Sequence, residues 1–219
     1  MAITLAEEIM LLSLDDESGV AKRKQAVGWA VAGGILLELV LAERVSVSGK
    51  YLEVTNASPT GDQLLDGRMA LIETWLGGRE KQVKKWLTKD HTKALDATLD
   101  SLSRRGVVVE EKHRTLGLFP VRRYPEADGA IEAEMRERLR AVVLGGAQPD
   151  TRTAGLIALI HSAKLHRLAF PDSPQRQVSR RMSEVADGHW AAASVRAALR
   201  DMQAAVAGVA AAAGAAAGS

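Results

Sequence analysis

Ser58-Pro59-Thr60-Gly61-Asp62-Gln63-Leu64-Leu65-Asp66 is the stretch that decides the fold of this chain. A Pro-Thr-Gly turn runs directly into a helix whose first residues are acidic. Asp62 is placed to accept hydrogen bonds from the unpaired N–H groups of the first helical turn, and its charge suits the positive end of the helix dipole. The stretch predicts a helix from Asp62 to about Leu76, ended by Gly77-Gly78.

Two stretches upstream of this one are also predicted to be helical. The first, Ile3 to Leu14, opens with Thr4 and Glu7 in a Thr-x-x-Glu capping box. The second runs from about Val20 to Ala42 and contains Leu36-Leu37-Glu38-Leu39-Val40-Leu41. Its Ala/Gly-rich middle allows another helix to approach closely. Glu38 lies in an apolar run, so we expect a structural role and a cationic partner, either Arg44 or a basic helix.

These three stretches, in this order and at this spacing, resemble the Golgi phosphoprotein 3 family over roughly residues 3 to 200. The Ala- and Arg-rich composition is similar to that of the bacterial members. The resemblance implies a non-enzymatic peripheral membrane protein, since the eukaryotic members read phosphatidylinositol 4-phosphate. It also implies a hydrophobic β-hairpin that serves membrane insertion and self-association.

The rest of the chain predicts a mainly α fold: a single globular helical domain with two β-hairpins, one protruding and apolar-tipped. The hairpins are expected at 44–54 and 107–123, and helices at 81–87, at 90–105 and from 126 onward, with breaks near 145–149 and 171–174. Asp150 and Ser173 are the expected caps after those breaks. We expect the domain to cover 1–203 and the Ala/Gly-rich tail 204–219 to fray beyond Gly208.

Composition excludes several classes of function. The chain has 219 residues and no cysteine, which removes disulfides, thiolate metal sites and cysteine nucleophiles and fits a reducing cytoplasm. Glu7 and Glu8 stand where a signal peptide is basic, and the apolar run 26–37 is too short to cross a bilayer. Any membrane contact is therefore expected to be peripheral, at the inner, cytoplasmic face.

The second hairpin carries the strongest functional pattern, because apolar residues near its tip are flanked by cations. An element of this kind suits insertion at the acyl boundary while its bases meet anionic headgroups. The alternative is that the apolar residues pack on the protein's own core or on a second subunit. The candidate insertion or self-association residues are Leu116, Leu118 and Phe119. The candidate headgroup-binding residues are Arg114, Arg122 and Arg123, together with the cluster Lys22, Arg23 and Lys24, whose alternative is a solvated helix start.

The resemblance also implies where a phosphoinositide pocket would lie. The family uses a Trp and an Arg nine residues apart and two Arg three residues apart. The corresponding positions are Arg23, Ala32, Thr92 and Leu95, so none of the four residue types is retained. We therefore expect binding of anionic lipid with little preference for the 4-phosphate.

Catalytic, cofactor and metal signatures are not found in the sequence. His161 and His166 are five residues apart, which is not the i, i+4 spacing of a helical metal pair. A winged-helix nucleic-acid binder is the alternative function, because helix 90–105 is followed by Gly106 and a basic hairpin. Asp96, Asp100 and the apolar tip disfavour nucleic acid. The expected partners are thus anionic membrane lipid and a second copy of the chain through hairpin 107–123, with no cargo protein identified.

Overall fold

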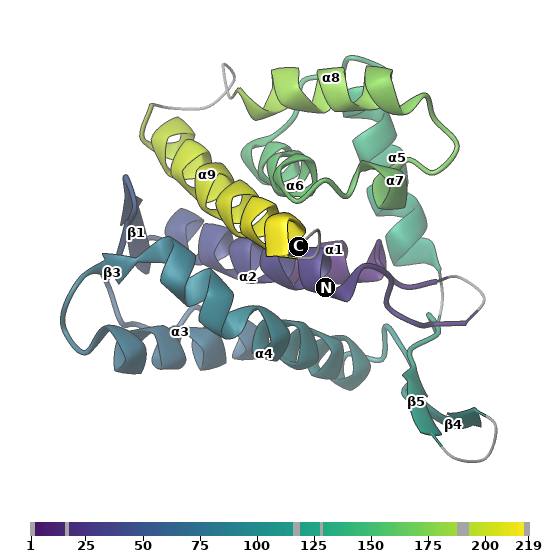
Figure 1. Cartoon of the computed structure of the whole chain (residues 1–219), viewed down its shortest axis with the longest axis horizontal. Helices are drawn as coiled ribbons and strands as arrows, with labels where there is room; N and C mark the ends of the chain where they lie inside the picture. The colour runs from purple at the N-terminus through teal and green to yellow at the C-terminus, as the bar shows by residue number, and fades with distance from the viewer. Residues whose placement is uncertain (1–2, 16–17, 116–118, 128, 188–192, 217–219) are drawn as a thin grey trace.

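The computed structural model describes residues 3–15, 18–115, 119–127, 129–187 and 193–216 (Figure 1). The helices are α1 Leu5–Leu11, α2 Lys24–Leu41, α3 Gln63–Leu76, α4 Val83–Arg104, α5 Ala130–Val143, α6 Thr151–Ser162, α7 His166–Ala169, α8 Gln175–Ala186 and α9 Ala193–Ala216. The strands are β1 Val45–Ser48, β2 Tyr51–Val54, β3 Lys81–Gln82, β4 Glu111–Thr115 and β5 Phe119–Arg123. The predicted mainly helical fold is confirmed.

Helix α2 lies at the centre, with α1, α4, α6 and α9 packed around it (Figure 1). A helix that is apolar on all sides must be covered on all sides, and α2 is. A Cβ added at Gly33 would lie 3.0 Å from both Leu159 and Val206, and one at Gly34 would lie 3.1 Å from the backbone nitrogen of Ala6. The predicted close approach of neighbouring helices is therefore confirmed. By length and composition alone, α2 is also the one helix in the described ranges that could cross a bilayer, but 67% of it is buried inside the protein.

The predicted caps hold the first and third helices. Thr4 and Glu7 form both hydrogen bonds of the capping box at α1. Asp62 accepts from the backbone N–H groups of Leu64 and Leu65, at 2.9 and 3.0 Å. Asp66, one turn into α3, reaches back to accept from the N–H and hydroxyl of Thr60 at 2.6 and 2.7 Å. The Pro-Thr-Gly turn is thus fixed from within the helix that it begins.

Some element boundaries differ from the prediction because tertiary contacts decide them. Lys81–Gln82, predicted as helical, pairs with β2 and makes the first hairpin a three-stranded sheet in the order β1-β2-β3. Helix α4 runs unbroken where two helical pieces were expected. In the second hairpin the first strand begins at Glu111, and of Val107–Val109 only Val108 forms a single bridge, to Glu126. The hairpin itself projects from the helical body (Figure 1).

The C-terminal part also departs from expectation. Asp150 caps α6 as predicted, by accepting from the N–H of Thr153, but Pro174 rather than Ser173 is the N-cap of α8. Fraying beyond Gly208 is wrong for the described residues, because α9 continues to Ala216. Val206 and Val209 are buried in the core, and this burial holds the Ala/Gly-rich segment in place. The boundary of the domain at residue 203 stays a prediction.

Candidate lipid-binding surface

The register of the protruding hairpin sorts its basic positions onto two faces. Lys112 pairs with Arg122 and Arg114 with Pro120, so the backbone alternation puts Lys112, Arg114 and Arg122 at positions of one face. Arg123, opposite Glu111, is at a position of the other face, as is Phe119 opposite Thr115. Arg123 is half-buried, and its Nε is buried without a hydrogen-bond partner. Of the three arginines predicted to bind headgroups, Arg114 and Arg122 therefore share a face and Arg123 does not.

The predicted apolar tip falls at the limit of what the structure describes. Leu116 and Leu118 lie outside the described residues. Phe119 begins β5, but its side chain, like those of Arg114 and Arg122, is not among the described ones. The insertion role of this tip stays a prediction.

A short loop ties the basic cluster at residues 22–24 to the base of the hairpin. Tyr124, directly after β5, donates its backbone N–H to the carbonyl of Gly19 at 2.9 Å. A Cβ at Gly19 would lie 2.6 Å from backbone nitrogens of Tyr124 and Pro125, and the residue has φ +60°, so glycine is required at this crossing. The loop then leads through Lys22 into α2. The two groups of predicted headgroup ligands thus belong to adjoining segments.

Within the basic cluster the three cations have different surroundings. Lys22 pairs with Asp15 at 2.6 Å, and this interaction holds the pKa of the Asp15 carboxyl below its usual range. Arg23 is the N-cap of α2 and donates from Nη1 to the carbonyl of Lys164 at 2.7 Å. Lys24 is exposed on the first turn of α2. Lys24 is therefore better placed than Lys22 to meet a headgroup.

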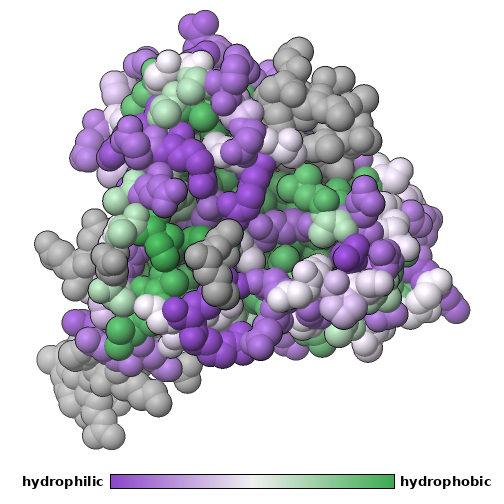
Figure 2. All heavy atoms as spheres, turned by 180° about the vertical axis from the view of Figure 1, so that it is seen from behind, coloured by the Kyte–Doolittle hydropathy of each residue, from purple (hydrophilic) through white to green (hydrophobic). Residues whose placement is uncertain are grey.

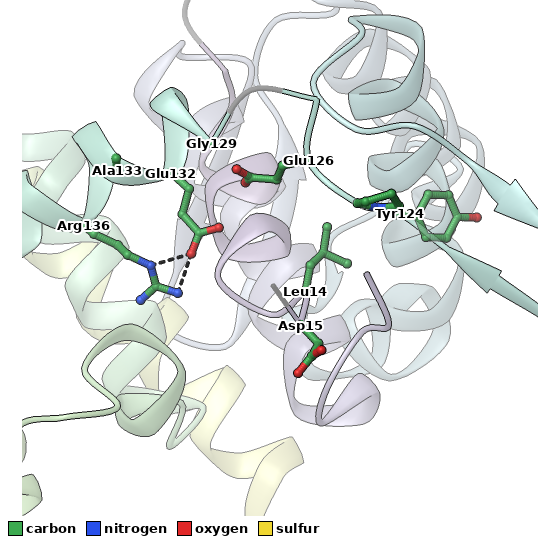
Figure 3. Close-up of a pocket in the computed structure, with 9 residues that line it drawn as sticks. Leu14, Asp15, Tyr124, Glu126, Gly129, Glu132, Ala133 and Arg136 are labelled. Atoms are coloured by element: carbon green, nitrogen blue, oxygen red, sulfur yellow. Dashed lines mark hydrogen bonds and ion pairs between the residues drawn. The ribbon is translucent and has the colours of Figure 1, made fainter. Parts of the chain in front are cut away.

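A cavity of about 370 Å³ beside the hairpin base is acidic rather than basic (Figure 3). Asp15, Glu126 and Glu132 line it, and its only lining cation among the described residues is Arg136, which pairs with Glu132. Carboxylates outnumber cations here, so this hollow does not suit a phosphate-bearing headgroup. It separates the hairpin base from α5.

The family's pocket positions do not form an anion site in this chain. Ala32 is fully buried in the core and Leu95 is 8% exposed, while Thr92 is exposed on α4. Between α2 and α4, Trp29 packs on His91 with ring centroids 5.7 Å apart. Of the four positions, only Arg23 supplies a cation.

Buried ion pairs join the three stretches that carry the family resemblance. Arg105, after α4, lies 3.1 Å from Glu7 and also pairs with Asp62. Arg152 on α6 pairs with Glu8 at 2.8 Å and with Glu38 at 3.3 Å. The partner of Glu38 is thus Arg152 on the largely apolar helix α6, and neither a basic helix nor Arg44, whose Nη1 donates to the carbonyl of Ala42. These acidic residues have structural roles.

Large apolar side chains are scattered over the surface that the structure describes. The most exposed is Val109, at 51%, just before the hairpin. Seen from behind, hydrophobic residues form separate patches divided by hydrophilic ones (Figure 2). No metal-binding group of three or more His, Asp or Glu is found in the described part of the chain.

A sequence profile of the family described as Golgi phosphoprotein 3 (GPP34) matches residues 5–202. Vacuolar protein sorting-associated protein 74 of Eremothecium gossypii is 26% identical over 175 residues, which cover 65% of this chain and 49% of that protein. The protein of the same name from Schizosaccharomyces pombe is 25% identical over 174 residues, covering 64% and 48%. The chain spans about half the length of these curated relatives. The extent of the profile match shows that the chain belongs to the Golgi phosphoprotein 3 family.

Proposed function

We propose that this chain is a non-enzymatic peripheral membrane protein that binds anionic lipid headgroups at the cytoplasmic face of a membrane. The observation that carries the proposal is the β4–β5 hairpin, which projects from the helical body and has three basic positions on one face (Figure 1). Family membership supports it, and the names of the two relatives place those proteins in vacuolar protein sorting.

The energetics of such a hairpin favour reversible attachment. Each Lys or Arg near an anionic leaflet contributes about 1 kcal/mol, and each large apolar side chain buried at the tip adds about 1.5–3 kcal/mol. The basic positions Lys112, Arg114 and Arg122 and the tip residues Leu118 and Phe119 together supply several kcal/mol. We propose that the same hairpin also serves self-association.

The winged-helix alternative receives less support. A recognition helix needs a free face beside the wing, whereas α4 packs on α2, α3 and α9, and the hairpin extends away from it (Figure 1). The exposed residues in the last three turns of α4 include Asp96 and Asp100, which repel phosphates.

Vesicle cosedimentation tests the proposal. The wild-type chain should bind phosphatidylglycerol vesicles, lose that binding as salt rises, and bind phosphatidylcholine vesicles poorly. The double variant Arg114→Gln/Arg122→Gln should weaken binding about thirtyfold, because two cations worth about 1 kcal/mol each are removed from one face. The matched control Lys84→Gln/Lys85→Gln removes two exposed cations from α4 and should change little. Salt-independent binding to both kinds of vesicle would contradict the electrostatic part of the proposal.

The hairpin tip has its own test. Leu118→Ser/Phe119→Ser should abolish vesicle binding or self-association and leave the midpoint of urea unfolding nearly unchanged, since the residues are proposed to contact lipid or a second copy. A variant that loses several kcal/mol of stability would instead place these side chains in the core. Circular dichroism during the urea titration distinguishes the two results.

Selectivity among anionic lipids is expected to be weak. Because Ala32, Thr92 and Leu95 stand where the family has arginines, phosphatidylinositol 4-phosphate should bind less than about tenfold more tightly than other lipids of equal charge, or within about 1.4 kcal/mol. Titration with vesicles matched in total charge measures this ratio of affinities. A preference for phosphatidylinositol 4-phosphate of more than about tenfold would contradict the expected weak selectivity.

A further inference from the structure

A second cavity, of about 630 Å³, lies where the start of α2, the turn between α6 and α7, and helix α8 meet. Its charge is opposite to that of the acidic cavity beside the hairpin base, where carboxylates outnumber cations. Five cations line it, and no Asp or Glu does so among the residues that the structure describes. The five cations are Arg23, Lys164, Arg167, Arg176 and Arg180, and the space that they line is called the cationic cavity.

The fold brings these cations together from three separate segments. Arg23 donates to the backbone carbonyl of Lys164 at 2.7 Å and so joins the start of α2 to the α6–α7 turn. On α8, Arg176 and Arg180 are four residues apart on one face, with Ser179 and Ser183 beside them. The spacing of Arg176, Arg180 and Arg181 along the chain is by itself typical of one solvated helical face. The structure places Arg23, Lys164 and Arg167 across the cavity from this face of α8, which the spacing along the chain does not predict.

Most of the charge in the cationic cavity is uncompensated. Glu184 pairs with Arg180 at 3.1 Å, but Lys164, Arg167 and Arg176 form no ion pair with a described residue. Helix α8 also begins here at Pro174, without a side-chain cap on its first N–H groups. Cations and a helix N-terminus that converge on one hollow repel each other, and a bound anion removes that repulsion.

Two histidines complete the wall of the cavity. His161 Nδ1 and His166 Nε2 lie 2.9 Å apart, so one ring donates to the other. Burial lowers the pKa of both rings, and the charges of His161 and Arg23 lower that of His166 further, while Asp187 opposes the shift at His161. Both shifts favour the neutral form of the rings, and a bound anion would raise the pKa of each ring.

We infer that the cationic cavity binds a phosphomonoester group. A terminal phosphate presents three acceptor oxygens and a charge near −2, which suits several guanidinium groups better than the two free oxygens of a diester. The volume has room for a small organic group attached to the phosphate. The site differs from the family's pocket positions, of which it contains only Arg23.

The phosphomonoester has two sources, a soluble metabolite or a lipid headgroup, and the lipid case rests on the proposed membrane function. Glycerol 3-phosphate, titrated by calorimetry into the full chain, probes the soluble source. Vesicles with phosphatidic acid, a lipid monoester, compared with phosphatidylglycerol vesicles of equal charge, probe the lipid source. Arg167→Gln/Arg176→Gln removes two unpaired, exposed cations from the cavity, and Lys84→Gln/Lys85→Gln is the matched control outside it.

The expected result is that Arg167→Gln/Arg176→Gln weakens binding of glycerol 3-phosphate, or of phosphatidic acid vesicles, at least tenfold, while the control stays within twofold. The histidine Cε1 proton resonances should report a rise in the pKa of His161 and His166 when the ligand binds. Failure to bind either probe, or an equal loss in the control, overturns the inference. Phosphatidylglycerol binding that survives in Arg167→Gln/Arg176→Gln and is lost in the hairpin variants leaves the proposed function intact.

Discussion

Arg105 and Arg152 show at the scale of single residues why three distant stretches of sequence occur together. Each arginine holds two carboxylates from different stretches: Glu7 with Asp62, and Glu8 with Glu38. The local half of this arrangement is predictable, because a cap such as Asp62 acts on the helix that follows it directly. The arginines are not predictable, since Arg152 is 114 residues from Glu38.

Asp62 has two structural functions, so its removal should cost more than an ordinary cap. Asp62→Ala removes the acceptor of two N–H groups of α3 and one of the carboxylates on Arg105. We expect a loss of about 1–2 kcal/mol in the free energy of unfolding. Urea unfolding measures it, with the exposed neighbour substitution Gln63→Ala as the control. Equal midpoints for the two variants would contradict the capping role.

Glu38 should make stability depend on pH. Burial raises the pKa of Glu38 from 4.5 to about 7, although the Arg152 charge opposes the shift. The folded protein therefore holds this proton more tightly than the unfolded chain does. The stability contribution is complete below pH 4.5 and is lost as the pH rises to about 7.

Glu38→Gln should flatten this part of the stability profile, by on the order of 2–3 kcal/mol between pH 4.5 and 8. The measurement is urea unfolding across that pH range, with the exposed Glu134→Gln as the comparison. If the unfolding free energy of Glu38→Gln depends on pH as steeply as that of the wild type, the Glu38 carboxylate is ionised throughout this range. That result would contradict the raised pKa of Glu38.

At the scale of elements, local signals predicted helices well and strands less well. Helix α3 begins and ends at the residues that its cap and its two glycines indicate. Strand β3 has only two residues, and nothing in Lys81–Gln82 distinguishes it from the helix that follows; its pairing with β2 decides it. The protruding hairpin was predicted, but the face to which each arginine belongs depends on a register that starts at Glu111.

Two glycines in helices should respond to the same substitution in opposite directions. Gly34→Ala places a Cβ 3.1 Å from the backbone nitrogen of Ala6, so α1 must move, and stability should fall by about 1–3 kcal/mol. Gly67 on α3 has no atom within 4 Å of an added Cβ, so Gly67→Ala should stabilise by about 0.5–1 kcal/mol. Thermal unfolding of both variants checks the sign, and a stabilised Gly34→Ala would contradict the close packing of α1 on α2.

At the scale of the whole molecule, α9 completes the core around α2. Its composition predicted a frayed end because it lacks a charged face, and only the positions of Val206 and Val209 against the other helices explain why it is ordered. The cationic cavity could not be predicted from the sequence for the same reason. Each of its three segments alone has the pattern of solvated surface, and only the fold places the three segments around one cavity.

A pair of truncations tests the importance of α9. A chain ended after Gln203 loses the buried Val206 and Val209, and its unfolding free energy should fall by roughly 3 kcal/mol or more. Its melting temperature should fall by roughly 10 °C. A chain ended after Ala213 keeps both valines and should melt near the full-length value. Equal melting temperatures for the full-length chain and both truncated chains would show that α9 does not stabilise the core.

The closure of α2 by α9 has a consequence for biosynthesis. Because Gly33 has no side chain, Val206 of α9 can pack directly against α2. Helix α9 is also the last of the described helices along the chain. While α9 is still inside the ribosome, the apolar face that it covers on α2 stays open to solvent. The domain therefore cannot complete its core until after translation reaches α9, and the nascent chain is the form most in need of chaperone protection.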